Sequence, residues 1–109
     1  ARDINVASYV RRITERNDKI FVWGTEPAIY VMSDRLPVGK YSVAYHIIDF
    51  GKLPETYELL TSQKPRIIIV HEKEKYDFPQ LNSLLISEYA SVKRFDDMKI
   101  YLKVNNSEL

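Results

Sequence analysis

The order of apolar and polar stretches along the chain predicts alternating strands and helices. Two runs of consecutive apolar residues, Ile20–Trp23 and Ile67–Val70, are typical of strands that are buried on both faces of a sheet. The segment Tyr41–Ile48 is rich in aromatic and β-branched residues, and it predicts another strand. Near the C-terminus, Val92–Phe95 and Met98–Val104 flank a pair of aspartates, which predicts a hairpin.

Apolar residues at helical spacing, together with prolines, predict the helices that separate these strands. The first helix places Val6 and Val10 on one face and ends before the first strand. Pro27, Pro54 and Pro79 each stand at a position that suits the first turn of a helix, where the missing backbone N–H costs nothing.

The resulting order, α-β-α-β-α-β-α-β-β, predicts a single soluble α/β domain over residues 1–109. We expect a three-layer, Rossmann-like, mostly parallel sheet with helices on both faces and a C-terminal antiparallel hairpin. The pattern leaves open whether the last strand inserts between its neighbours or lies outside them. Because the chain starts almost directly in a helix, we also expect it to be a domain cut from a longer protein.

Composition and charge exclude several classes of function. A chain of 109 residues with a net charge of +1 has the length of one compact domain and lacks the basic excess of a dedicated nucleic-acid binder. The absence of cysteine excludes disulfides, thiolate metal sites and thiol catalysis. No apolar run approaches the ~20 residues that are needed to span a bilayer.

One edge of the predicted sheet gathers the candidate functional residues. A strand that ends at Trp23 is followed by a short helix, and ligands usually bind at the carboxyl ends of strands in an open parallel sheet. We therefore expect Trp23, Glu26, Tyr30 and Arg35 to form an edge that contacts a ligand or a partner. Glu26 and Arg35 stand at the two ends of the short helix, so they either pair with each other or one of them meets that ligand or partner.

The sequence contains no recognisable catalytic, cofactor-binding or metal-binding set. Gly24 is followed by Glu26, a carboxylate that would repel phosphate, and no phosphate-binding glycine loop is present. The chain has two histidines, His46 and His71, whereas a metal site needs three or four converging ligands. Asp96-Asp97 has the character of a turn rather than of an acid–base pair. We therefore predict no catalytic residue, no cofactor and no metal.

Several short motifs, taken together, resemble a known family. They are Tyr9-Val10-Arg11-Arg12, Asp18-Lys19-Ile20-Phe21-Val22-Trp23-Gly24, Glu26-Pro27, Ile29-Tyr30, Arg35-Leu36-Pro37, Pro65-Arg66-Ile67-Ile68-Ile69-Val70-His71-Glu72, and Phe78-Pro79 through Tyr89 to Tyr101. In this order they resemble the soluble C-terminal domain of polytopic membrane glycosyltransferases. That group includes the dolichyl-phosphate-mannose protein mannosyltransferases and the lipid-A aminoarabinose transferases.

The resemblance implies a specific role. The parent enzyme would transfer a sugar from a polyprenyl-phosphate donor, with its catalytic acid in the membrane portion, so no catalytic residue is carried over to this chain. The chain would be a non-catalytic accessory domain on the extracytoplasmic side of the membrane. Its partners would be the transmembrane portion of the same polypeptide and an acceptor glycan, lipid or protein, and not nucleic acid.

The fold alone allows a different interpretation. A free-standing soluble α/β module that binds a small molecule or serves in regulation would have the same pattern of elements, because fold does not fix function. Several apolar segments of ~20 residues upstream of Ala1 in the full reading frame would favour the glycosyltransferase hypothesis. A short soluble leader would favour the free-standing module.

Overall fold

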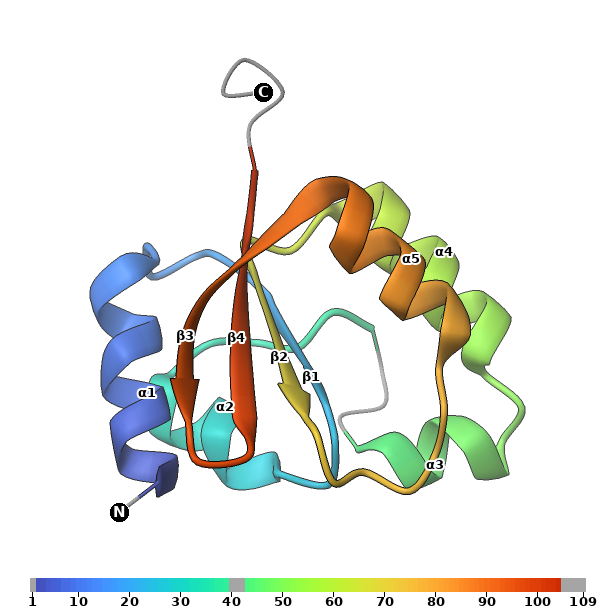
Figure 1. Cartoon of the computed structure of the whole chain (residues 1–109), viewed down its shortest axis with the longest axis horizontal. Coiled ribbons are helices and arrows are strands. Elements are labelled where there is room, and N and C mark those ends of the chain that lie inside the picture. The colour runs from blue at the N-terminus through green and yellow to red at the C-terminus, as the bar shows by residue number, and fades with distance from the viewer. Residues whose placement is uncertain (1, 40–42, 105–109) are drawn as a thin grey trace.

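The computed structural model describes residues 2–39 and 43–104, with the backbone alone for Tyr45. Figure 1 shows the helices and strands that these residues form. They are α1 (Arg2–Ile13), β1 (Ile20–Trp23), α2 (Pro27–Ser33), α3 (Ala44–Asp49), α4 (Leu53–Gln63), β2 (Ile67–His71), α5 (Pro79–Glu88), β3 (Tyr89–Phe95) and β4 (Met98–Lys103).

The strands form one mixed sheet of four strands in the order β1-β2-β4-β3. Strands β1 and β2 are parallel, and Ile20 and Trp23 lie opposite Ile67 and Val70. Strand β4 is antiparallel to both of its neighbours. The prediction of an α/β fold with a C-terminal hairpin is confirmed, whereas the prediction of a mostly parallel, Rossmann-like sheet is wrong.

The hairpin explains the mixed sheet. Asp96, at a positive φ of 53°, and Asp97 join β3 directly to β4, so the two strands must run in opposite directions. Strand β4 then returns between β3 and β2, which answers the question that the sequence pattern left open: the last strand inserts between its neighbours. Strands β1 and β2 are joined by a crossover through α2, α3 and α4, which is long enough for a parallel pair.

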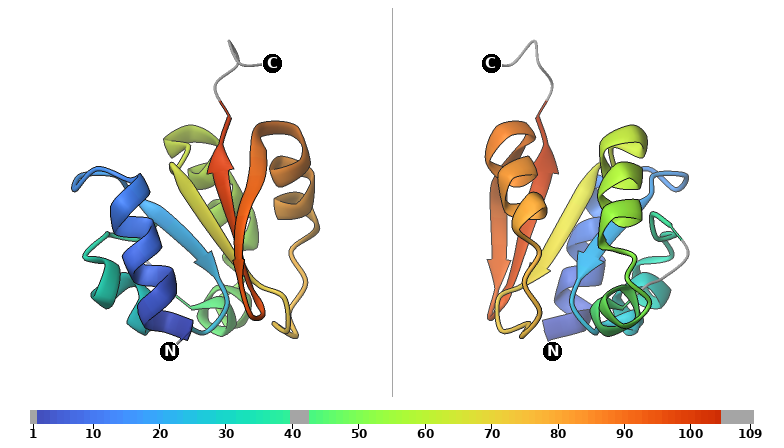
Figure 2. Two further views of the ribbon diagram at one scale, coloured as in Figure 1. Left: turned by 60° about the vertical axis from the view of Figure 1, so that its left-hand side comes forward. Right: turned by 90° about the vertical axis from the view of Figure 1, so that its right-hand side faces the viewer.

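The sheet has a hydrophobic core on each face, because successive residues of a strand point to opposite sides. Val6, Val10, Ile29 and Tyr30 of helices α1 and α2 pack on one face, with Ile20 and Val22 of β1 and Ile67 and Ile69 of β2. On the other face, Phe21, Trp23 and Ile68 pack against residues of α3, α4 and α5. Figure 2 shows α1 and α2 on one side of the sheet and α4 and α5 on the other.

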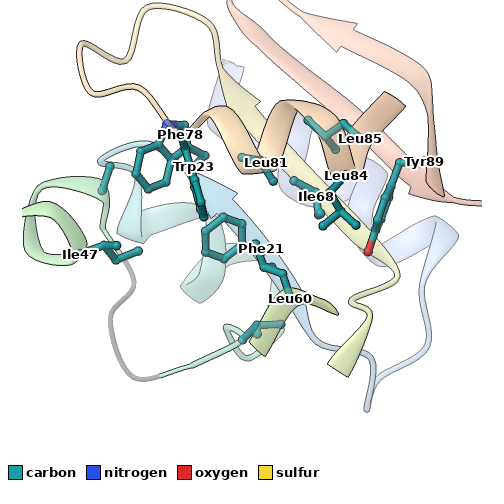
Figure 3. Close-up of a cluster of buried hydrophobic side chains, with 12 residues drawn as sticks. Phe21, Trp23, Ile47, Leu60, Ile68, Phe78, Leu81, Leu84, Leu85 and Tyr89 are labelled. Carbon is teal, nitrogen blue, oxygen red and sulfur yellow. The ribbon is translucent and has the colours of Figure 1, made fainter. Parts of the chain in front are cut away.

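The core on the α4–α5 face contains most of the buried aromatic side chains, as Figure 3 shows. The ring of Trp23 stacks on Phe21 at 6.4 Å and contacts Phe78 at 4.9 Å between ring centroids. Its indole Nε1 donates a hydrogen bond to the Tyr76 carbonyl at 3.2 Å. The end of β1 is therefore fixed to the loop that precedes α5.

The predicted strand Tyr41–Ile48 is a second error: its described part contains helix α3 (Ala44–Asp49), while Tyr41 and Ser42 lie outside the described residues. Ala44, Ile47 and Ile48 have the spacing of one helix face, and they contact the aromatic core. The Ala44 N–H also donates to the Gly24 carbonyl at 3.0 Å, which holds the start of the helix at the end of β1. Packing has overridden the strand propensity of the β-branched residues.

Within the described residues, no helix is both long and apolar enough to cross a bilayer.

Candidate functional site

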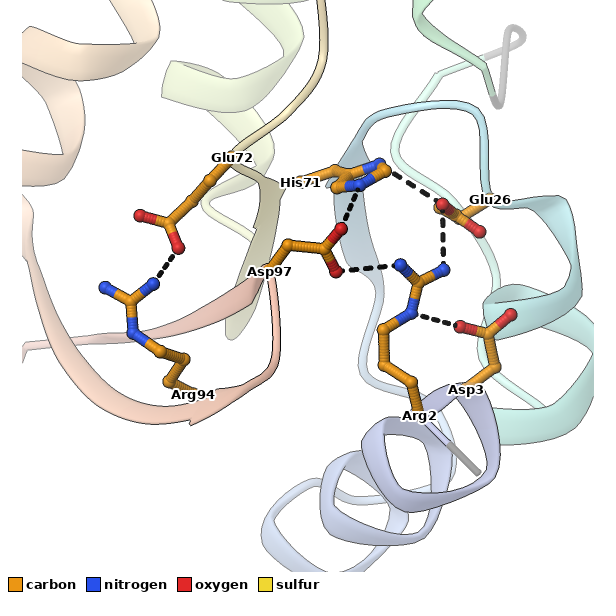
Figure 4. Close-up of polar contacts among 7 residues, drawn as sticks. All are labelled: Arg2, Asp3, Glu26, His71, Glu72, Arg94 and Asp97. Atoms are coloured by element: carbon orange, nitrogen blue, oxygen red, sulfur yellow. Dashed lines mark hydrogen bonds and ion pairs between the residues drawn. The ribbon is translucent and has the colours of Figure 1, made fainter.

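A group of charged side chains closes one end of the sheet, where β1 and β2 end and the β3–β4 hairpin turns (Figure 4). We refer to Arg2, Glu26, His71 and Asp97 as the polar junction. The four side chains come from four places in the chain: the start of α1, the residue before α2, the end of β2 and the hairpin turn. They are half-buried, with exposed side-chain fractions between 15% and 24%.

The four side chains form a closed ring of contacts. Arg2 Nη2 lies 3.0 Å from Glu26 Oε1, and Arg2 Nη1 lies 2.8 Å from Asp97 Oδ1. His71 Nδ1 lies 3.2 Å from Glu26 Oε1, and His71 Nε2 lies 2.8 Å from Asp97 Oδ2. A fifth residue, Asp3, accepts a 2.9 Å hydrogen bond from Arg2 Nε. Each carboxylate of the ring thus contacts both Arg2 and His71.

Gly24 permits this arrangement, because it lets the end of β1 approach the end of β2 closely. A Cβ added at Gly24 would lie 2.9 Å from the Cβ of His71, closer than two such carbons can approach. The residue after Trp23 therefore has to be glycine if His71 is to keep its position. The close approach also brings Glu26, two residues further along the chain, within reach of the His71 ring.

The geometry of His71 is that of a structural clamp rather than of a catalytic base. In a nucleophile–histidine–carboxylate triad, the carboxylate holds one ring nitrogen and the other nitrogen faces the nucleophile. Here a carboxylate occupies each nitrogen. A neutral imidazole donates only one hydrogen, so only the doubly protonated ring can donate to both Glu26 and Asp97. Neither nitrogen faces an open position at which a substrate could bind.

The hollow beside His71 is also small. It has a volume of about 140 Å³ and is lined by Trp23, Glu72, Glu74 and Phe78 among others. Ligand pockets usually have volumes of roughly 300–1,000 Å³. Among residues 2–39 and 43–104, no group of three or more acidic or histidine side chains could hold a metal ion.

The charged partners of Asp97 make the stability of the protein depend on pH in the acidic range. Hydrogen bonds from His71 and then Arg2 lower the pKa of Asp97 from 3.8 to about 2. A carboxyl group whose pKa is lower in the folded than in the unfolded state stabilises the fold when ionised, and this contribution is lost as the pH falls through the folded-state pKa. The contribution of Asp97 is therefore complete above pH 3.8 and disappears towards pH 2.

We expect the Asp97→Asn variant to lose this part of the acid dependence. Its free energy of unfolding, measured by urea denaturation, should fall less steeply between pH 3.8 and pH 2 than that of the wild type. Asp96→Asn is the matched control, since Asp96 is exposed and has no ion pair among the described residues. Equal pH profiles for Asp97→Asn and the wild type would contradict the assignment.

Of the four residues that the sequence predicts as one edge, the structure brings together Tyr30 and Arg35, which line a hollow of about 310 Å³. Trp23 points into the aromatic core, and Tyr30 lies in the core on the opposite face of the sheet. The hydroxyl of Tyr30 accepts a 2.8 Å hydrogen bond from the Val22 N–H, and burial raises the pKa of that hydroxyl. Both rings hold β1 in place, and each also lines a hollow at the surface, Trp23 beside His71 and Tyr30 beside Arg35.

Glu26 and Arg35, the charged members of the predicted edge, do not pair with each other. Glu26 pairs with Arg2 and His71. Arg35 is 9% exposed and donates to Thr14 Oγ1 at 3.0 Å, to the Thr14 carbonyl, and to the carbonyls of Ser33 and Asp34. It joins the end of α2 to the residue after α1. Of the four predicted residues, only Glu26 belongs to the polar junction.

Sequence reasoning missed Arg2 and His71 as partners of Glu26, and it missed Asp97 as the fourth member of the polar junction. One signal was present: His71 follows a buried strand as Gly24 follows another, and the carboxyl ends of adjacent parallel strands lie side by side. No local signal marks Arg2 or Asp97, because their contacts depend on where α1 and the hairpin pack.

Comparison with protein-family models, with curated proteins and with solved structures gives no match to this chain.

Proposed function

We propose that this chain is a non-catalytic accessory domain of a membrane-embedded glycosyltransferase that uses a polyprenyl-phosphate sugar donor. In this proposal, the domain lies on the extracytoplasmic side of the membrane. It packs on the transmembrane portion of the same polypeptide and contributes to the surface that meets the acceptor glycan, lipid or protein.

The observation that carries the proposal is the position of the residues on which the family resemblance rests. They surround β1. Trp23 and Gly24 end the strand, Tyr30 binds its Val22 N–H, and the Leu36 carbonyl accepts a 3.1 Å hydrogen bond from the Ile20 N–H. Pro37 forms an isolated bridge with Ile20. Motifs that are dispersed in the sequence thus build one structural unit, which supports a shared fold with the resembled domains.

The polar junction supports the non-catalytic part of the proposal. Arg2, Glu26, His71 and Asp97 neutralise one another within hydrogen-bond distance, and both nitrogens of His71 are occupied. A catalytic group needs a free position at which the reacting atom can bind. The most concentrated set of charged side chains on the predicted functional edge therefore serves to hold four segments of the chain together.

We expect the purified chain to show no sugar transfer from a polyprenyl-phosphate sugar and no hydrolysis of that donor. The measurement is release or transfer of a radiolabelled sugar, compared with a buffer control and with the full-length protein in detergent. The full-length protein should be active. Turnover by the 109-residue chain clearly above buffer would contradict the non-catalytic assignment.

The full reading frame provides the independent test of the membrane assignment. Several upstream apolar segments of ~20 residues are expected. A reading frame without such segments would contradict the proposal and would favour the alternative, a free-standing soluble α/β module that binds a small molecule or regulates a partner.

A further inference from the structure

A second hollow lies at the end of the sheet opposite the polar junction, the upper end in Figure 1. Its volume is about 530 Å³, within the range of roughly 300–1,000 Å³ that is usual for small-molecule sites. Three segments line it: residues 17–19 before β1, residues 63–66 between α4 and β2, and Lys103 at the end of β4. These segments meet because β1, β2 and β4 are consecutive strands of the sheet.

The lining of this hollow is strongly basic. It contains Lys19, Lys64, Arg66 and Lys103, against the single carboxylate of Asp18. Asp18 already accepts a 2.8 Å hydrogen bond from the Glu15 N–H, and Lys103 is 3.5 Å from Glu88. Within the described residues, Lys64 and Arg66 have no ion pair. A chain with a net charge of only +1 thus concentrates cations at one place.

Helix dipoles do not account for this concentration. Cations near the C-terminal end of a helix are stabilised by the partial negative charge there, which explains Arg11 and Arg12 in the last turn of α1. Lys64 caps α4 in the same way. Lys19, Arg66 and Lys103, however, stand at the ends of strands, and strands have only small net dipoles. Like charges repel at close range, so an anion between them would relieve the repulsion that remains beside Asp18 and the Lys103–Glu88 pair.

We propose that this hollow binds a phosphate group, carried by a free phosphate compound or by the headgroup of an anionic lipid. A guanidinium such as that of Arg66 matches two phosphate oxygens at once, and lysine ammonium groups supply further charge from around the anion. Two hydrogen bonds join these segments: the Lys103 N–H donates to the Arg66 carbonyl at 2.9 Å, and the side chain of Lys19 donates from Nζ to Gln63 Oε1 at 3.2 Å. This inference does not depend on the glycosyltransferase proposal.

Two probes test the site with the purified 109-residue chain. Inorganic phosphate is titrated while backbone amide shifts are followed by NMR, and co-sedimentation is measured with vesicles. The vesicles consist of phosphatidylcholine alone or of an equimolar mixture with phosphatidylglycerol. The Lys64→Gln/Arg66→Gln double variant removes two exposed cations from the hollow. Lys73→Gln/Lys75→Gln is the matched control, because it removes two exposed cations from the loop after β2, at the other end of the sheet.

We expect phosphate or the anionic vesicles to bind the wild type and the control pair equally, and the Lys64/Arg66 variant roughly tenfold or more weakly. Shifts caused by phosphate should centre on residues 63–66 and 103. Binding of inorganic phosphate would assign a free phosphate compound, whereas binding of anionic vesicles without free phosphate would assign a lipid headgroup. Absence of both, or an equal loss in the control pair, would overturn the proposal.

Discussion

Replacing Ile68 by alanine is expected to lower the free energy of unfolding by about 2–5 kcal/mol, which is a large part of the ~5–15 kcal/mol that stabilises a typical domain. Ile68 is fully buried in β2, an interior strand of the sheet, and it packs in the aromatic core with Phe21 and Trp23. The loss combines the transfer free energy of the removed methyl groups with the cost of a cavity that rigid neighbouring strands cannot fill.

Ile86→Ala is the matched control for this experiment. It removes the same atoms from a side chain that is 86% exposed on α5, so the change in stability should stay within about 0.5 kcal/mol. Urea denaturation of both variants measures the difference, provided that the dependence on urea concentration is unchanged. Similar midpoints for Ile68→Ala and the wild type would show that β2 is not at the centre of the sheet.

The two parallel strands could be predicted from the sequence because their signal is local. Ile20–Trp23 and Ile67–Val70 are apolar without interruption, and a strand with helices on both faces has no polar side to display. The hairpin could also be predicted, since Asp96 and Asp97 separate two segments that both have the residue pattern of a strand. Helix α3 could not be predicted from the sequence. A six-residue segment with β-branched residues fits the pattern of a strand as well as that of a helix until its packing partners are known.

The arrangement of the sheet required information that no single segment contains. Loss of the strand predicted at Tyr41–Ile48 leaves one parallel pair, and the insertion of β4 beside β2 makes the remaining pairs antiparallel. The pairing of β4 with β2 on one side and with β3 on the other therefore depends on how α5 and the hairpin pack against the rest of the protein. Local patterns gave the elements, whereas long-range packing decided their order.

The candidate site shows the same division. Proximity in sequence placed Trp23, Glu26, Tyr30 and Arg35 on one edge, yet Trp23 and Tyr30 pack in cores on opposite faces of the sheet, and Glu26 belongs to the polar junction. The residues that Glu26 contacts, Arg2 and His71, are 24 and 45 positions away in the numbering of the chain, and Asp97 joins the ring through those two. A polar junction of this kind follows from topology, and of its four members the sequence alone placed only Glu26 at the functional edge.

Gly24 gives the second large effect. We expect Gly24→Ala to lower the free energy of unfolding by about 1–3 kcal/mol, the usual range for overpacking a rigid site. The new methyl group would meet the Cβ of His71, part of a strand that cannot move without breaking its pairing with β1 and β4. If His71 is displaced, its hydrogen bond to Asp97 weakens, so the pKa of Asp97 should also rise from about 2 towards 3.8.

A double-mutant cycle with His71→Gly isolates the contact from other effects of the added methyl group. His71→Gly removes the Cβ that Gly24→Ala would strike, so Gly24→Ala should cost much less in that background than in the wild type. Urea denaturation of the four proteins gives the coupling free energy, and NMR titration of Asp97 in Gly24→Ala gives the pKa. The same cost in both backgrounds would mean that the approach of β1 to His71 is not what requires glycine. A reduced cost of Gly24→Ala in the His71→Gly background, together with a raised pKa of Asp97, would show why position 24 requires glycine. Glycine there would be what lets the end of β1 pack directly against His71 of the polar junction.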